Sequence, residues 1–362
     1  MNDVAGPAAL KKKTDMTTEL PLISVILPAY NEEALLEDHV STILQYLQSI
    51  EPRYRWELLI INDGSSDSTG PIANRLAAEC AGVRALHHPR NFGLGQTLKF
   101  GFANSSGDYI VTLDVDLSYD PQHIEELVDK IRESHAKIVL ASPYMEGGSI
   151  RNVPFLRRTL SILGNRFLRL FVRGHFSTLT SMVRVYDGPF IRSLELRSTG
   201  MDIMPEMLYK AMVLRAGIDE LPGRLDWGPQ RRYGESRASS MHLGRHVSST
   251  ILSGFVFRPF LFFIVPGLAV GLFALYVDGW MFAHFFESLS SLKQAGIDYT
   301  FSMAFRIAYN AHPHTFVTAL LSTMLAIQLL GLGVIALQNK KYFEDLFHLS
   351  STGTRSLRHK VD

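Results

Sequence analysis

Two long charge-free segments near the C-terminus place the strongest constraint on how this chain can fold. Residues 259–277 contain no charged side chain, and neither do residues 315–337. Because a bilayer's hydrocarbon core is about 30 Å thick and an α-helix rises about 1.5 Å per residue, each segment can cross it as a helix. Neither segment shows the amphipathic stripe of a helix on a soluble core. The sequence therefore predicts two transmembrane helices, with two buried helices of a soluble domain as the alternative.

Basic residues flank the two segments on one side. Arginines precede the first segment and lysines and arginines follow the second, whereas residues 278–314 between them carry only Lys293 and Arg306. The positive-inside rule then places both termini in the cytoplasm. We therefore expect a juxtamembrane segment at 238–258, an extracytoplasmic loop at 278–314 and a cytoplasmic tail at 338–362.

The rest of the composition agrees with a domain on the cytoplasmic side. The formal net charge is +1, so nothing in the overall charge indicates a nucleic-acid partner. The single cysteine, Cys80, excludes an intramolecular disulfide framework and fits a reducing compartment. Residues 1–20 include Lys11, Lys12 and Lys13 but no apolar core, so we expect a mobile tail and not a signal peptide.

Short apolar runs alternate with amphipathic stretches from residue 21 to residue 142. The apolar runs are typical of buried strands, and the stretches between them have apolar residues at helical spacing. This alternation predicts a mostly parallel sheet with helices on both faces. The helices are expected at residues 33–49, 69–81 and 122–135, and another leads from a Gly-rich turn at 91–95 to residue 104. An edge strand is expected at 218–222.

Polar side chains follow three of the predicted strands. Asp114 and Asp116 come directly after the strand that begins at Tyr109, and Asp63 follows the second strand. Ligands of parallel α/β sheets bind beyond the carboxyl ends of the strands. Carboxylates there are hard oxygen ligands that suit Mg²⁺ or Mn²⁺, with substrate phosphates completing the coordination. The alternative is a solvated loop in which Asp116 or Ser118 opens the next helix.

Together these stretches resemble the family 2 glycosyltransferases, which have the nucleotide-sugar-binding GT-A fold. The resemblance covers about residues 21–237 and is closer to the dolichyl- or polyprenyl-phosphate mannosyl- and glucosyltransferases. It implies that Asp63 accepts hydrogen bonds from the nucleotide base. It also implies a base and ribose pocket lined by Pro28, Tyr30 and Glu32. A metal ion would be held by Asp114, Asp116 and Ser118, and Asp116 would be essential for catalysis.

The resemblance also implies a site for the acceptor phosphate. Arg157 and Ser161 match the family's Arg-x-x-x-Ser pair, and four residues apart on a helix they share a face. Arg231 matches the Arg of the family's Arg-x-x-Gly-x-Ser-Lys element, with Arg237 in the Lys position. The alternative for the arginines of residues 154–173 is contact with anionic lipid headgroups.

Two departures from the family pattern fall on the acceptor side. Pro143 stands where the family has an arginine that commonly joins the acceptor-phosphate site. The segment from Leu179 to Arg184 has neither the Asp nor the Gly of the family's Asp-x-Thr-Ser-Gly-Phe-Arg element. The donor-side motifs are intact, so the resemblance supports the donor site more strongly than the acceptor site.

The expected activity is inverting transfer of a hexose from a nucleotide-diphosphate sugar, of the GDP-mannose or UDP-glucose type, to polyprenyl or dolichyl phosphate. The first alternative is transfer to a lipid or glycan hydroxyl, for which Asp202 or Glu206 is the candidate general base. The second is a non-catalytic interaction subunit with a decayed site. Membrane lipid is an expected partner, and relatives with two spans suggest a homo-oligomer. Neither the sugar nor the lipid chain length follows from the sequence.

Overall fold

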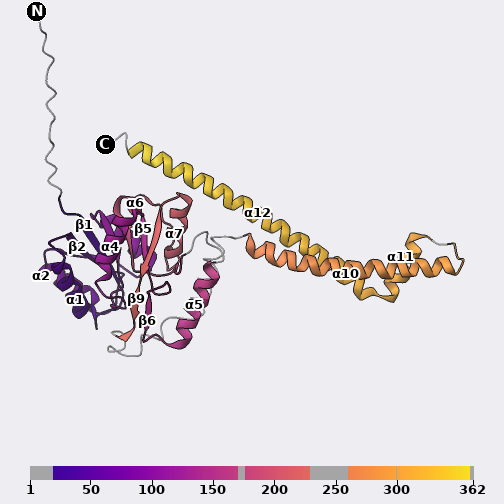
Figure 1. The fold of residues 1–362 in the computed structure, drawn as a ribbon, viewed down its shortest axis with the longest axis horizontal. Coiled ribbons are helices and arrows are strands. Elements are labelled where there is room, and N and C mark those ends of the chain that lie inside the picture. The colour runs from indigo at the N-terminus through magenta and orange to yellow at the C-terminus, as the bar shows by residue number, and fades with distance from the viewer. Residues whose placement is uncertain (1–18, 170–175, 229–259, 299, 359–362) are drawn as a thin grey trace, which may run out of the picture.

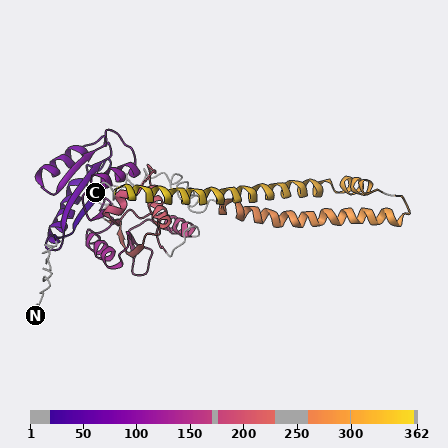
Figure 2. The ribbon, with the colours of Figure 1, turned by 90° about the horizontal axis from the view of Figure 1, so that it is seen from above.

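The computed structural model describes residues 19–169, 176–228, 260–298 and 300–358. They form an α/β domain from which a long helical hairpin extends to one side (Figure 1). Figure 2 shows that the second helix of the hairpin returns over the domain.

A seven-stranded sheet forms the centre of the domain. Its strand order is β3-β2-β1-β4-β7-β5-β8, and every pairing is parallel except those that β7 makes with β4 and β5. The predicted mostly parallel sheet is therefore confirmed, with β8 at its edge as expected. The strands are β1 (Leu22–Ala29), β2 (Arg55–Asn62), β3 (Val83–His87), β4 (Tyr109–Thr112), β5 (Ile138–Ser142), β7 (Arg184–Asp187) and β8 (Ile218–Pro222).

Helices cover both faces of the sheet because side chains alternate between its faces along each strand. On β1, Ile23 and Val25 point into one apolar core and Ile26 into the other. The first core is closed by α1 (Leu36–Ser49), α2 (Thr69–Glu79) and α4 (His123–Ser134). The second is closed by α3 (Leu94–Asn104), α6 (Gly188–Ser193) and α7 (Ile203–Val213). Helix α5 (Phe155–Arg169) and the parallel pair β6 (Ser149–Arg151) and β9 (Arg224–Asp226) lie beyond the main sheet.

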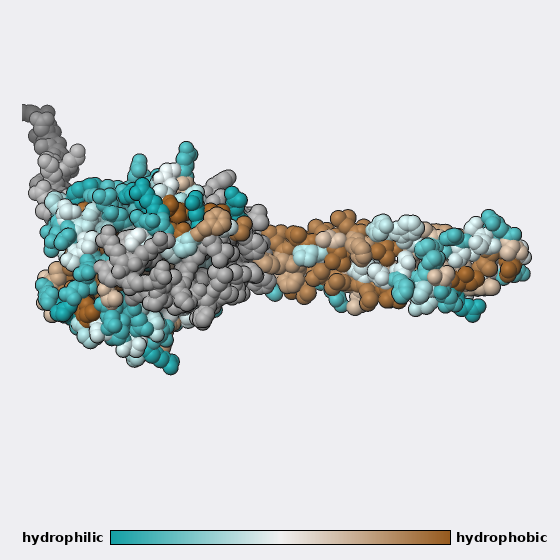
Figure 3. All heavy atoms as spheres, turned by 90° about the horizontal axis from the view of Figure 1, so that it is seen from below, coloured by the Kyte–Doolittle hydropathy of each residue, from teal (hydrophilic) through white to brown (hydrophobic). Residues whose placement is uncertain are grey.

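The hairpin consists of α10 (Leu261–Gln294) and α12 (Pro313–Arg358), joined by α11 (Phe301–Ala311). Leu261–Gln294 and Pro313–Phe347 are long and apolar enough to cross a membrane. The surface of the hairpin is apolar next to the domain and mixed towards its far end (Figure 3). Small residues let the two helices approach closely: a Cβ added to Gly333 would lie 2.5 Å from Ile264 Cγ1.

Helix α10 continues past residue 277, where the charge pattern placed the end of the first span. Asp278 was expected to begin the loop, but its Oδ2 accepts a hydrogen bond of 2.9 Å from Thr323 Oγ1 on α12. A partner on the facing helix lets an acid remain inside an apolar hairpin. The helix extends to Gln294, so part of the predicted loop 278–314 is helical.

The C-terminal part of α12 packs against α7 of the α/β domain. Tyr209 Oη donates a hydrogen bond of 3.1 Å to Glu344 Oε1, and its ring stacks on Phe343 with centroids 6.2 Å apart. The ammonium group of Lys210 lies 5.3 Å from the centroid of the Phe347 ring. Phe347 is 8% exposed and belongs to the second apolar core. The hairpin is thus a packed part of the domain and not a separate anchor.

We therefore expect Phe347→Ala to destabilise the α/β domain. Truncating a buried Phe costs about 3–5 kcal/mol in a closed core. Because Phe347 lies at the rim of this core, we expect the lower value of about 3 kcal/mol. This loss corresponds to a fall of roughly 6 °C or more in melting temperature. The measurement is thermal unfolding of the full chain in detergent. Leu346→Ala is the matched control, since Leu346 is 67% exposed on the same helix turn. Equal melting temperatures for the two variants would contradict the packing role.

Candidate active site

The chain order of the sheet reverses at β1, which has β2 on one side and β4 on the other. Such a reversal creates a crevice at the carboxyl ends of the two strands, where ligands of open α/β sheets bind. Tyr30 and Glu32 follow β1 at this edge, and Asp114 and Asp116 follow β4. The structure therefore brings these four predicted site residues to one end of the sheet.

The turn that carries Asp114 and Asp116 is fixed from both sides. Its middle residue, Val115, is buried, and its carbonyl oxygen lies 2.8 Å from Nδ1 of the buried His39 on α1. The Ser118 amide donates a hydrogen bond of 2.9 Å to Asp116 Oδ1, and Leu117 adopts a positive φ of 51°. Asp116 thus caps its own turn. Neither Asp116 nor Ser118 opens the next helix, because α4 begins later, at His123.

Three carboxylates interact at this edge of the sheet. Burial raises the pKa of Asp114 well above its usual range, and the negative charges of Asp116 and Glu32 raise it further. A nearby cation would relieve this repulsion, so Asp114 and Asp116 could supply carboxylate ligands to a divalent metal ion. Within the described part of the chain, no three His, Cys, Asp or Glu side chains are arranged as a metal site. An ion here would take its remaining ligands from phosphates and water, as Mg²⁺ commonly does.

Ser118 was predicted as a third metal ligand. It is 5% exposed, and its backbone is engaged on both sides, since its carbonyl oxygen accepts a hydrogen bond of 2.8 Å from the Asp226 amide. These contacts fix the position of Ser118 behind Asp116. Its role as a ligand stays a prediction.

The loops after β1 and β2 are tied to each other. The Asn31 amide donates to Ser65 Oγ at 3.0 Å, and Asn31 Oδ1 accepts from the Ser66 amide at 2.9 Å. The Glu32 amide donates to Thr69 Oγ1 at 2.7 Å. Tyr30, next to this tie, is 47% exposed. The loops thus hold Glu32 in place and leave an aromatic ring at the surface. The base and ribose pocket stays a prediction.

Asp63 is buried and holds the turn between β3 and α3. Its Oδ1 accepts from the Phe92 amide at 3.0 Å and lies 2.8 Å from His88 Nδ1, and its Oδ2 accepts from the Gly93 amide at 2.9 Å. The structure therefore gives Asp63 a role in shaping the pocket. The predicted hydrogen bond to the nucleotide base stays a prediction, as does the contact of Pro28, which lies on β1 beside Ile61 of β2.

Glycines 93 and 95 bring this turn against the segment that precedes α7. Gly93 has a φ of 87°, and the Gly95 amide donates to Thr199 O at 2.8 Å. A Cβ on Gly95 would lie 2.5 Å from the carbonyl oxygen of Ser198. Both glycines are therefore needed for backbone packing. The contact places the segment with Asp202 beside the turn that Asp63 holds.

The two candidate general bases have different surroundings. Glu206 accepts hydrogen bonds from Lys210 Nζ at 2.6 Å, the Arg197 amide at 2.9 Å and the Ser198 amide at 2.8 Å. Burial opposes ionisation of Glu206, but these donors outweigh it and lower its pKa. A carboxylate stabilised in this way is a weak proton acceptor. Asp202 at the start of α7 accepts one hydrogen bond of 3.1 Å, from the Gly200 amide, and is the better candidate.

On the acceptor side, Tyr144 links the end of β5 to α5. Tyr144 Oη donates a hydrogen bond of 2.6 Å to Ser161 Oγ. Burial raises the pKa of Tyr144, although Ser161 and the positive charge of Arg158 oppose this. The backbone of Arg157 lies on α5 one turn before Ser161, whereas its side chain is outside the described atoms. Arg231 lies outside the described residues.

Arg184 holds the segment that precedes β7, which lacks the Asp and the Gly of the family pattern. Its side chain is fully buried and donates to three carbonyl oxygens, those of Ser181 at 2.6 Å, Leu179 at 2.8 Å and Met204 at 3.0 Å. These contacts join the segment to α7. Arg184 is therefore a structural residue.

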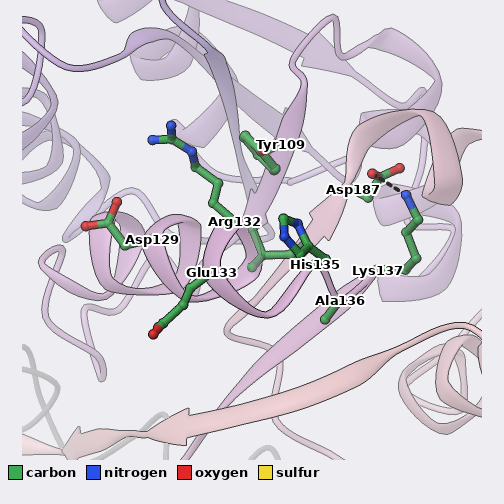
Figure 4. Close-up of a pocket in the computed structure, with 9 residues that line it drawn as sticks. Tyr109, Asp129, Arg132, Glu133, His135, Ala136, Lys137 and Asp187 are labelled. Carbon is green, nitrogen blue, oxygen red and sulfur yellow. Dashed lines mark hydrogen bonds and ion pairs between the residues drawn. The ribbon is translucent and has the colours of Figure 1, made fainter.

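A cavity of about 600 Å³ lies at the opposite edge of the sheet (Figure 4). It is formed around the first residue of β4, Tyr109, and the end of α4, with Arg132 and His135. Lys137 and Asp187 close one side with an ion pair of 2.7 Å. Because this edge carries the amino end of β4, the cavity is separate from the predicted site.

Sequence reasoning missed two residues that shape the site. His39 is one polar residue of the predicted helix at 33–49, and Tyr144 follows Pro143 in the chain without belonging to a motif. Their partners, Val115 and Ser161, are 76 and 17 residues away in the chain. No local pattern reveals such pairs.

Comparison with known proteins identifies one domain. A family model described as Glycosyl transferase family 2 matches residues 24–190. The chain is 31% identical over 210 residues to Glycosyltransferase AglD of Haloferax volcanii, covering 58% of this chain and 33% of that protein. It is 29% identical over 191 residues to Dolichol-phosphate mannosyltransferase of Pyrococcus furiosus, covering 52% of each.

A relative that the chain matches along almost its whole length is Undecaprenyl-phosphate mannosyltransferase of Micrococcus luteus. It is 27% identical over 242 residues, covering 65% of this chain and 95% of that protein. By contrast, the chain spans a third of the Haloferax protein and about half of the Pyrococcus protein.

Proposed function

We propose that this chain, whose residues 24–190 match the model of glycosyl transferase family 2, transfers a hexose from a nucleotide-diphosphate sugar to a polyprenyl phosphate. The observation that carries the proposal is the position of Glu32, Asp114 and Asp116 after the carboxyl ends of β1 and β4, where the chain order of the sheet reverses. Relatives named for dolichol phosphate and undecaprenyl phosphate support the acceptor class.

On the donor side, the diphosphate would lie over the turn of Asp114 and Asp116, with the base and ribose towards Tyr30 and Asp63. Asp114 and Asp116 would hold Mg²⁺ or Mn²⁺, which supplies positive charge to the departing diphosphate. The hydrogen bond from Ser118 and the contact of His39 with Val115 keep this turn in one conformation. A preorganised turn loses little free energy to rearrangement during the reaction.

The engagement of one candidate general base supports a phosphate acceptor. A phosphate acceptor is already largely anionic at pH 7, since its second pKa is about 6, and can attack the anomeric carbon without a general base. Glu206, one of the two base candidates, is occupied by Lys210 and two amides. Displacement by a phosphate oxygen would invert the anomeric centre.

The hairpin would bring this acceptor to the domain. With both termini in the cytoplasm, α10 and α12 cross the bilayer and the α/β domain lies at the cytoplasmic surface. Contacts of α12 with Tyr209 and Lys210 support a fixed position of the domain on the hairpin. A second copy of the chain is a further proposed partner.

The test is the steady-state dependence on polyprenyl phosphate at fixed donor, in neutral detergent. If Arg157 contacts the phosphate, Arg157→Ala should lower kcat/KM for the acceptor by about tenfold or more, because a charge-assisted hydrogen bond contributes roughly 1.5–3 kcal/mol. Arg166→Ala is the matched control, since Arg166 is an exposed residue of the same helix. It should change kcat/KM less than about twofold.

If Arg157→Ala and Arg166→Ala lower kcat/KM equally, the arginines of α5 act as a general contact with anionic surfaces. Arg157 would then have no specific role in binding the acceptor phosphate. Unchanged kinetics for Arg157→Ala would contradict a phosphate acceptor. Transfer to a hydroxyl would then be favoured, for which Pro143 provides some support because it has no side-chain donor for a phosphate. Asp202 would be the next residue to replace.

A further inference from the structure

Helix α11 lies where the surface of the hairpin changes from apolar to polar. On α10, residues 261–286 are apolar apart from Asp278 and His284, and the eight residues to Gln294 are mostly polar. At 1.5 Å per residue the apolar part spans roughly 39 Å, close to the thickness of a bilayer with part of its headgroup regions. The end of this part therefore marks the far membrane surface.

Both ends of α11 lie at that level of the hairpin. The ring of Phe301, its first residue, stacks on Phe285 with centroids 6.4 Å apart. The ring of His312, which follows its last residue, stacks on His284 with centroids 3.7 Å apart. Since residues 284 and 285 are neighbours on α10, α11 runs across the hairpin and not along it, as Figure 1 also shows.

The sides of α11 have different chemistry. One side is formed by Ala304 and Ala308, which have no exposed surface. Helix α11 packs against both α10 and α12. A second side presents aromatic rings at helical spacing: Phe301 is 73% exposed, Phe305 49% and Tyr309 40%. A third side consists of the polar residues Ser302, Arg306 and Asn310.

The aromatic side continues the apolar surface of the membrane helices. Phe305 and Tyr309 contact the ring of Phe316, with centroids 5.2 and 5.8 Å apart. Phe316 belongs to the charge-free part of α12, so the aromatic side of α11 faces that part of the hairpin. Aromatic side chains favour the boundary between headgroups and acyl chains, and amphipathic helices lie in its plane.

We propose that α11 is an interfacial helix in the leaflet opposite the α/β domain, with Phe301, Phe305 and Tyr309 inserted among the lipids. The partner of this surface is the headgroup and acyl-chain boundary of the bilayer. Because α11 lies across the hairpin, it resists movement of α10 and α12 along the membrane normal. It thereby sets the depth of the hairpin and the height of the domain above the opposite surface.

The test places spin labels on two sides of α11. Cys80→Ser removes the native thiol, and Phe305→Cys or Asn310→Cys is added to the full chain in phosphatidylcholine vesicles. Collision with oxygen reports lipid exposure, and collision with a water-soluble nickel chelate reports water exposure. For each label, the ratio of its collisions with oxygen to its collisions with the chelate is measured. We expect this ratio to be several-fold higher for the label at 305 than for the label at 310.

Each other outcome overturns the proposal. Two water-exposed labels would place α11 outside the membrane, and two lipid-exposed labels would place it within the hydrocarbon core. Labels at Phe301→Cys and Ser302→Cys repeat the comparison if a first variant does not fold. The readout needs no transfer activity, so its failure is distinct from a failure of the proposed function.

Discussion

Asp116→Asn is expected to lower the rate of hexose transfer by about two to three orders of magnitude with either Mg²⁺ or Mn²⁺. The substitution keeps an oxygen that can accept the hydrogen bond from the Ser118 amide, so the turn should keep its shape. It removes one negative charge from a group of three that also includes Asp114 and Glu32. Losing a preorganised charge at a reacting centre costs about 3–4 kcal/mol, which is this change in rate.

Asp120→Asn is the matched control for this prediction. Asp120 is an exposed acid of the same loop, and its Oδ1 accepts a hydrogen bond of 2.8 Å from the Gln122 amide. The same change of one atom there should leave the transfer rate within about twofold. Rates are compared at saturating donor, together with the melting temperature. An Asp116→Asn enzyme with nearly normal turnover would show that the acids do not act on the donor.

The strands and helices of the domain were predictable because local patterns determine them. Apolar runs such as residues 22–27 have no alternative to burial between two layers of helices. The insertion of β7 between β4 and β5 was not predictable, because it pairs Val111 with Val185 and Val139 with Val185, far apart in the chain. Strand order depends on such long-range pairings, which a single sequence does not display.

The candidate site was predictable to the extent that it depends on strand ends. Tyr30, Glu32, Asp114 and Asp116 share an edge because β1 and β4 are parallel, which the alternation of elements implies. The engagement of Glu206 was not recognised, although Lys210 four residues later is a signal for an ion pair on one helix face.

The limit of local reasoning is clearest at Asp278. A charge after nineteen apolar residues is the usual sign that a span has ended, and that rule placed the boundary at residue 277. Thr323, on the other helix of the hairpin, supplies a hydrogen-bond donor that removes part of the cost of keeping the acid there. The partner of Asp278 is therefore a residue that the local pattern around Asp278 does not include.

Arg184→Met is expected to cause a large loss of stability of the described domain. The methionine has a similar length but cannot donate, so the carbonyl oxygens of Leu179, Ser181 and Met204 lose their partner in a fully buried place. Leaving several buried acceptors unpaired costs about 3–5 kcal/mol in total. The measurement is the free energy of unfolding, or the melting temperature, of the full chain in detergent.

Arg197→Met is the control for the loss of a guanidinium group, because the Arg197 side chain is 78% exposed. It should change the free energy of unfolding by less than about 0.5 kcal/mol. Arg184→Lys keeps the charge but cannot reach three carbonyl oxygens in the same geometry, so it should fall between the other two variants. A stable Arg184→Met protein would show that water or a rearranged α7 satisfies these carbonyls. If the variant folds at low temperature, its nucleotide affinity should be near normal, since these contacts join β7 to α7 and not to the turn of Asp114 and Asp116.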